Sequence, residues 1–171
     1  MLNTISQWLA GVAAVKDRDS LRPILNPIGD RYSSQTLSSA GLAIKAGGSA
    51  IVKAGSAFYA SAQGIPVTKA INTDMAALSG TVVNATFNAY CFFIDRAGNL
   101  TSAMGTAGAT LAAMKFPPFP EGKALIGFVL INPTGTGDFV GGTTALDDGT
   151  VTPNAVYVNT TGPFDPTVLL N

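Results

Sequence analysis

The feature that most constrains the fold is the run of residues 81–104, TVVNATFNAYCFFIDRAGNLTSAM. Strand side chains alternate between two faces, and from Tyr90 to Ile94 the residues on both faces are apolar. Only the first half of the run alternates with polar residues, and we expect these to point to solvent: Asn84, Thr86 and Asn88. A strand that is apolar on both faces must be covered on both. The run therefore predicts a long central strand inside a sheet sandwich or against a partner chain.

Two β-hairpins are predicted by their turn residues. Residues 95–99, DRAGN, form the first turn, since Gly98 and Asn99 both tolerate positive φ, and residues 100–104 begin the return strand. The second hairpin joins residues 42–45 to residues 50–53 through the loop AGGS.

The rest of the chain after Ser33 is divided by glycine, proline and asparagine. Residues 64–69 predict a strand at a sheet edge, because Pro66 has no donor for an inner ladder. Residues 115–123, KFPPFPEGK, predict a crossing between sheets or over an end of the domain. Residues 124–132, ALIGFVLIN, predict a second core strand. Many short strands without alternating helices predict an all-β fold, an antiparallel β-sandwich or jelly roll.

The first 34 residues follow another pattern. Apolar residues from Leu2 to Val12 recur at the spacing of a short amphipathic helix, and prolines 23 and 27 predict an extended path after it. We therefore divide the chain into residues 1–34, an N-terminal helix and extended arm, and residues 35–171, a β-sandwich domain. A helix this short is marginal alone in water, so it must dock on its own domain or on a neighbouring subunit.

Docking on a neighbour would make the arm a partner-binding site. Trp8 would be the aromatic anchor, a residue type enriched in binding hot spots. The arginines would offer forked donors to carboxylates of the partner. The candidate partner-binding residues are Ile5, Trp8, Leu9, Val12, Arg18, Arg22 and Arg31.

The low charge of the chain bears on its partners. Charged residues make up 12% of the 171 residues, about half the ~25% of an ordinary soluble domain. A surface with few charges is easily desolvated when another protein covers it. The composition therefore favours a subunit of an assembly over an ordinary extracellular β-domain, and we expect a homotrimer or higher oligomer. The formal net charge is zero and no Lys/Arg run occurs, which argues against direct binding of nucleic acid.

Catalytic and metal-binding residues are scarce. The chain has no His, the commonest general base and metal ligand, and the lone Cys91 allows neither a zinc cluster nor a disulfide framework. The Asp147-Asp148 pair lacks the spaced ligands of a calcium loop and predicts a turn. We expect no enzyme activity, no cofactor and no metal site. No apolar run reaches the ~20 residues of a membrane span and no signal-like N-terminus occurs, so we expect a soluble product of the cytosol without membrane contact.

The second half of the chain carries a resemblance. It lies within residues 84–166, above all in NAYCFFIDRAGNLTSAMGTAG, FPPFPEGKALIGFVLINPTGTGDFVGGTTALDDGT and AVYVNTTGPFDP. In these runs the chain resembles the small virion structural proteins of tailed bacteriophages.

The resemblance implies a non-enzymatic virion component made in the host cytoplasm. It points to a capsid decoration (cement) protein on the capsid surface, whose β-sandwich forms a trimer while the N-terminal arm binds the major capsid protein or another virion protein. The alternative is a tail or head-fibre module that binds a host receptor or glycan through exposed aromatic residues such as Tyr157 or Phe164.

Overall fold

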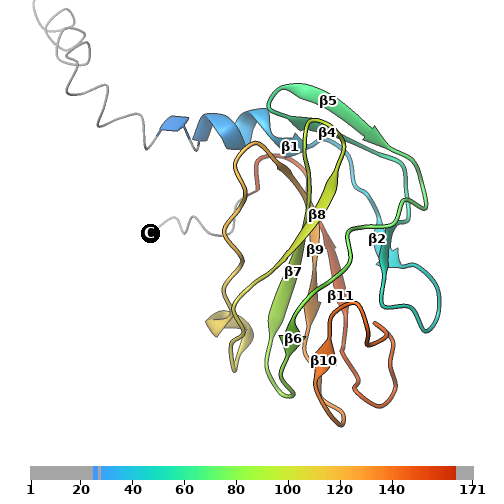
Figure 1. The fold of residues 1–171 in the computed structure, drawn as a ribbon. Helices are drawn as coiled ribbons and strands as arrows, with labels where there is room; N and C mark the ends of the chain where they lie inside the picture. The colour runs from blue at the N-terminus through green and yellow to red at the C-terminus, as the bar shows by residue number, and fades with distance from the viewer. Residues whose placement is uncertain (1–24, 27, 165–171) are drawn as a thin grey trace, which may run out of the picture.

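The computed structural model describes residues 25–26 and 28–164 of the chain. Strands form nearly all of its regular structure, and every strand pair is antiparallel (Figure 1). The only helical parts described are residues 25–26 and 28–33 and the single turn η1 (Leu111–Ala113). The predicted all-β class is confirmed.

The strands form four sheets, with the orders β11-β9-β7-β8, β1-β4-β5, β2-β3 and β10-β6. In chain order they are β1 (Gln35–Thr36), β2 (Leu42–Ile44), β3 (Val52–Ala54), β4 (Phe58–Ala62), β5 (Ile65–Lys69), β6 (Thr81–Val82), β7 (Asn88–Ile94), β8 (Leu100–Met104), β9 (Ala124–Ile131), β10 (Phe139–Val140) and β11 (Val156–Asn159).

The four-stranded sheet contains the predicted central strand and its hairpin. β7 is buried along its whole length and pairs with β8 on one side and with β9 on the other. In the turn between β7 and β8, the Asp95 carboxylate accepts hydrogen bonds from the amides of Ala97 and Asn99, both at 2.9 Å. β9, the predicted second core strand, is buried at every residue except Leu130.

The central strand begins later than the sequence pattern predicts. Residues 83–86 form a turn in which Ala85 has a φ of 59°, and β6 pairs with β10 instead of continuing into β7. Asn88, which we expected to face solvent, is buried. Its side chain donates to the Gly105 carbonyl at 3.2 Å and accepts from the Ala89 amide at 2.8 Å. The polar residues here lie in a turn or are buried and hydrogen-bonded. The alternation of polar and apolar residues alone could not distinguish such positions from the solvent-facing side of a strand.

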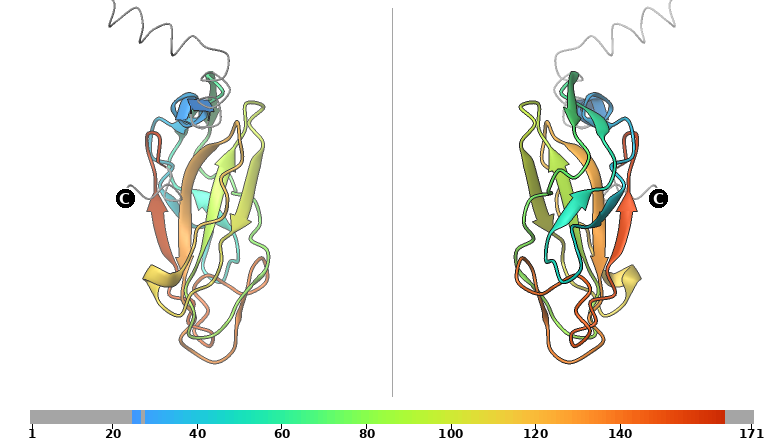
Figure 2. Two further views of the ribbon diagram at one scale, coloured as in Figure 1. Left: turned by 90° about the vertical axis from the view of Figure 1, so that its left-hand side faces the viewer. Right: turned by 90° about the vertical axis from the view of Figure 1, so that its right-hand side faces the viewer.

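The main hydrophobic core lies between the four-stranded sheet and the smaller sheets. One face of β7 and β9 meets residues of β2, β3, β4, β6 and β10 there, including Tyr90, Phe92, Ile126, Val129, Val52, Phe58 and Phe139. Tyr90 and Phe139 contact edge to face, with ring centroids 6.2 Å apart. The two opposite views of Figure 2 show the four-stranded sheet and the β2–β3 hairpin on different sides of the molecule.

The opposite face of the four-stranded sheet, called here the outer face, carries a second apolar cluster. It consists of Cys91, Phe93, Leu125 and Phe128. Residues 115–123 do not cross between sheets, since β8 and β9 on either side of them belong to the same sheet. They lie instead over the outer face and place Phe116 against Phe128 at 4.9 Å and Phe119 against Phe93 at 5.3 Å between ring centroids.

Two smaller predictions are also confirmed. β2 and β3 form the expected hairpin, and β5, which contains Pro66, lies at the edge of its sheet.

Candidate interaction site at the base of the N-terminal arm

The acidic pair Asp147 and Asp148 binds backbone amides, those of its own turn in the case of Asp148 and that of Gly48 in the β2–β3 loop in the case of Asp147. Asp148 Oδ1 accepts from the amides of Thr150 and Val151 at 2.8 and 2.7 Å, and the Asp147 carboxylate accepts from the Gly48 amide at 3.0 and 3.1 Å. These carboxylates are used in turns, as predicted. Among the described residues no group of three or more His, Cys, Asp or Glu side chains could hold a metal ion. That part of the chain also contains no helix of the length and hydropathy that crossing a bilayer requires.

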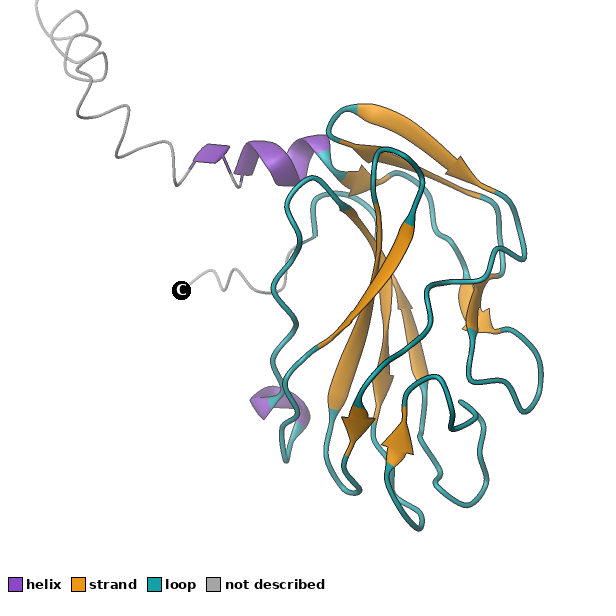
Figure 3. Ribbon diagram, viewed as in Figure 1, coloured by secondary structure: helices purple, strands orange, loops and turns teal. Residues whose placement is uncertain are grey.

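The predicted extended arm ends in a helix. Residues 25–26 and 28–33 are helical (Figure 3), whereas the prolines led us to expect an extended path over residues 22–31. Proline disrupts a helix interior, but in the first turn its missing N–H would have no intrahelical partner anyway. Helical residues close to a proline near the start of a helix are therefore compatible with the sequence, and the prediction was wrong for the described part of this segment.

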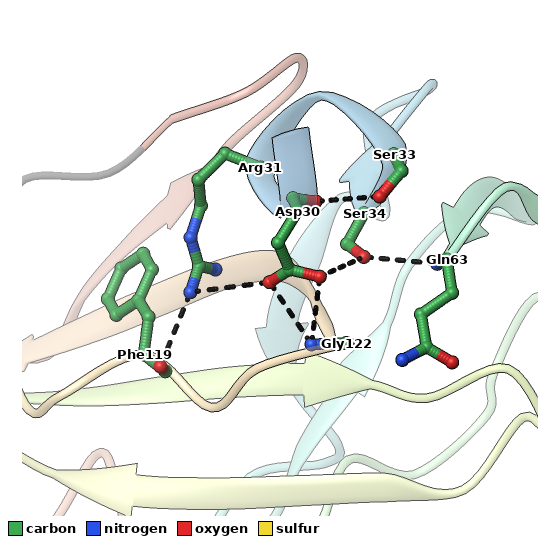
Figure 4. Close-up of polar contacts among 7 residues, drawn as sticks. All are labelled: Asp30, Arg31, Ser33, Ser34, Gln63, Phe119 and Gly122. Carbon is green, nitrogen blue, oxygen red and sulfur yellow. Dashed lines mark hydrogen bonds and ion pairs between the residues drawn. The ribbon is translucent and has the colours of Figure 1, made fainter. Parts of the chain in front are cut away.

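Asp30 holds this helix against the β-domain (Figure 4). Its carboxylate accepts hydrogen bonds from the Gly122 amide at 3.0 and 3.1 Å and from Ser34 Oγ at 3.3 Å. The Ser34 hydroxyl accepts in turn from the backbone N–H of Gln63 at 3.0 Å. Asp30 thus joins the helix to the β4–β5 turn and to the segment before β9.

Ser33 adds backbone contacts to the same junction. Its carbonyl accepts from the Gly64 amide and from Ser61 Oγ, both at 2.9 Å, and its hydroxyl donates to the Asp30 carbonyl at 3.1 Å. The last turn of the helix is therefore bound to both ends of the β4–β5 hairpin turn, which sets the direction in which the helix leaves the domain. We call residues 30–34 with Gln63 and Gly122 the Asp30 junction.

Arg31 contacts its own domain. Its guanidinium donates to the Phe119 carbonyl at 3.3 Å, lies 5.2 Å from the centre of the Phe119 ring and is 3.8 Å from the Asp30 carboxylate. The Arg31 side chain is 16% exposed. Arg31 therefore has contacts within its own chain, and its predicted role in binding a partner stays a prediction. The other candidate residues lie outside the described residues, and their partner-binding role stays a prediction: Ile5, Trp8, Leu9, Val12, Arg18 and Arg22.

The same helix presents apolar side chains to solvent. Leu25, Ile28 and Tyr32 follow the three-and-four spacing of one helix face and are 56%, 49% and 64% exposed. Beyond the helix, the exposed Leu37 and Tyr59 adjoin one another, since the Leu37 amide donates to the Tyr59 carbonyl at 2.8 Å. We call Leu25, Ile28 and Tyr32 the helix stripe. The helical spacing of these three residues is present in the sequence. We did not interpret it as a helix face, because the prolines led us to predict an extended conformation.

The aromatic residues considered for receptor binding contact their own domain. Tyr157 packs against the main core, and burial, with a smaller effect from Asp147, raises its pKa. Phe164 stacks on Phe128 with ring centroids 6.3 Å apart.

Comparisons of this chain with protein-family models, with curated proteins and with solved structures give no match.

Proposed function

We propose that this protein is a non-enzymatic structural subunit of a bacteriophage particle that binds a protein lattice through its N-terminal arm. The observation that carries the proposal is the helix of residues 28–33. The Asp30 junction holds its end firmly on the β-domain, while the helix stripe remains open to solvent. A docking element that is already ordered loses less conformational entropy on binding, and exposed apolar patches are typical of protein-binding surfaces.

Within this class we infer a capsid decoration protein at the capsid surface, with the major capsid protein as its partner. The resemblance of residues 84–166 to small tailed-phage virion proteins supports this choice. The 12% share of charged residues supports it as well, because a surface with few charges is cheap to desolvate in an assembly. In this proposal the sheets on either side of the main core form a β-sandwich, and three copies assemble on the lattice.

The test uses phage shells prepared without this subunit. The full chain should bind them and raise their unfolding temperature. Residues 25–171 alone should bind at least tenfold more weakly, because they lack the stripe of Ile5, Trp8, Leu9 and Val12. Replacing the helix stripe with serine in the full chain (Leu25→Ser, Ile28→Ser, Tyr32→Ser) should also weaken binding.

Val83→Ser is the matched control, since Val83 is similarly exposed but lies in the turn after β6. It should bind like the unmodified chain. The proposal would be contradicted if the shells bound no protein and gained no heat resistance. It would also be contradicted if the protein bound host cells and not the shells, as a fibre module would.

A further inference from the structure

We propose that the outer face of the four-stranded sheet is the docking site of the chain's own C-terminal segment, residues 167–170, TVLL. The described chain reaches Phe164 on this face, where the Phe164 ring stacks on Phe128 at 6.3 Å with an interplanar angle of 19°. The last described residue thus lies on an apolar surface. The proposal does not depend on the function proposed above.

Part of the outer face is left open by the described residues. Phe116 and Phe164 both contact Phe128 there. The next pair on the same face is Leu130 with Val156, because side chains two residues apart on a strand share a face. Leu130 is the one residue of β9 that is not buried, and Val156 is 54% exposed. An apolar strip that the described residues cover only in part therefore continues beyond Phe164.

The chain approaches this strip in the required direction. β11 begins opposite Leu130 and ends opposite Gly127. The chain then reverses near Gly162, which has a φ of 79°, and brings Phe164 back over Phe128. Between Thr160, whose amide binds the Ile126 carbonyl, and Phe164 the described chain therefore returns along β9 in the direction of Leu130.

The length and the chemistry of the segment suit the strip. An extended chain advances about 3.3 Å per residue, so positions two apart on β9 are about 7 Å apart and residues 167–170 lie within reach of Leu130 and Val156. Val168, Leu169 and Leu170 are aliphatic and match the aliphatic pair beneath. The segment of the same chain is favoured over that of a second copy, because a short tether gives an effective concentration in the millimolar range.

The experiment measures disulfide formation in the full chain carrying Val156→Cys and Leu169→Cys. The native thiol does not compete, since Cys91 is buried and burial raises its pKa to about 12, which leaves little reactive thiolate. Under mild oxidation we expect an intrachain disulfide. It should form at least tenfold faster than in a matched chain with the same cysteines and Val168→Asn and Leu170→Asn, which keeps the tether but makes the segment polar.

Each other result overturns the proposal. Equal rates in the two chains would show that the tether alone brings the cysteines together. Disulfides between chains would assign the strip to the segment of a neighbouring copy. No disulfide in either chain would place the segment elsewhere. Far-UV circular dichroism of both chains checks that the fold is unchanged, and Val156 tolerates the substitution because it is exposed.

Discussion

At the scale of single residues, Asp30 joins the N-terminal helix to a segment far away in the sequence. It lies 92 positions from Gly122 in sequence, yet its carboxylate binds that amide with both oxygens. A carboxylate that accepts backbone N–H bonds forms charge-assisted hydrogen bonds, which are stronger than neutral ones.

We expect Asp30→Ala to lower the free energy of unfolding by about 1–3 kcal/mol, because the partly buried Gly122 amide and Ser34 hydroxyl lose their acceptor. Urea unfolding followed by circular dichroism measures the loss. Asp74→Ala is the control. Asp74 forms an exposed ion pair with Lys45, and such pairs contribute about 0–1 kcal/mol. A similar loss in both variants would contradict a special role for Asp30.

The burial of two ionisable side chains leads us to expect that the free energy of unfolding decreases at alkaline pH. Burial raises the pKa of Cys91 from 9.0 to about 12 and the pKa of Tyr90 from 10.0 to about 12. The folded state therefore holds these protons more tightly than the unfolded state. Their contribution is fully present below pH 9 and is lost as the pH rises towards 12.

Urea midpoints measured from pH 8 to 11 should decrease as the pH rises. Cys91→Ala should flatten the decrease most between pH 9 and 10, because the Cys91 thiol ionises before Tyr90 in the unfolded chain. An unchanged slope in Cys91→Ala would show that other groups cause the decrease.

At the scale of elements, β9 is the strand that connects the sheet. It lies between β7 and β11, and its register against β7 shifts between Phe92 and Phe93. Gly127 lies at this shift, where a Cβ atom would collide with the Val158 carbonyl of β11 and would lie 2.7 Å from Leu42 Cδ1 of β2. A larger residue at this position would therefore push β11 or the Leu42 side chain away from β9.

Gly127→Ala should lower the free energy of unfolding by about 1–3 kcal/mol, as overpacking of a filled interior does. Thermal unfolding measures the loss. Gly149→Ala provides the matched control, because nothing lies within 4 Å of a Cβ atom there, and it should change stability by no more than about 0.5 kcal/mol. Equal unfolding temperatures for both variants would rule out the close packing of β9 on β11.

At the scale of the whole molecule, the exposed apolar side chains and the few charges bear on self-association. Apolar residues are exposed on the helix stripe and also at Leu37 and Tyr59. Large exposed apolar patches are uncommon on monomers, and most oligomers of one chain are closed and symmetric.

The full chain should therefore sediment as a trimer, at three times its mass of 17.4 kDa, at micromolar concentration. Replacing the helix stripe with serine should shift the equilibrium towards monomer, whereas Val83→Ser should not. A full chain that remains monomeric at high concentration and on shells would contradict the predicted oligomer.

Local patterns in the sequence were sufficient to predict much of the β-domain. Two runs that are apolar on both faces predicted the buried strands β7 and β9, and Gly98, which has a φ of 82°, predicted the hairpin turn between β7 and β8. Pro66 predicted the edge position of β5. These predictions succeed because side-chain alternation, positive φ and a missing N–H act within a few residues of the chain.

Only the tertiary structure decided which distant segments meet. The pairing of β6 with β10, the burial of Asn88 and the contact of Asp30 with Gly122 each join parts of the chain that no local period connects. The helix of residues 28–33 belongs to the same group, because its last turn is held by hydrogen bonds to the β4–β5 turn and to the segment before β9. A polar residue looks the same in sequence whether it binds water or a buried backbone amide, so its partner becomes known only once the chain is folded.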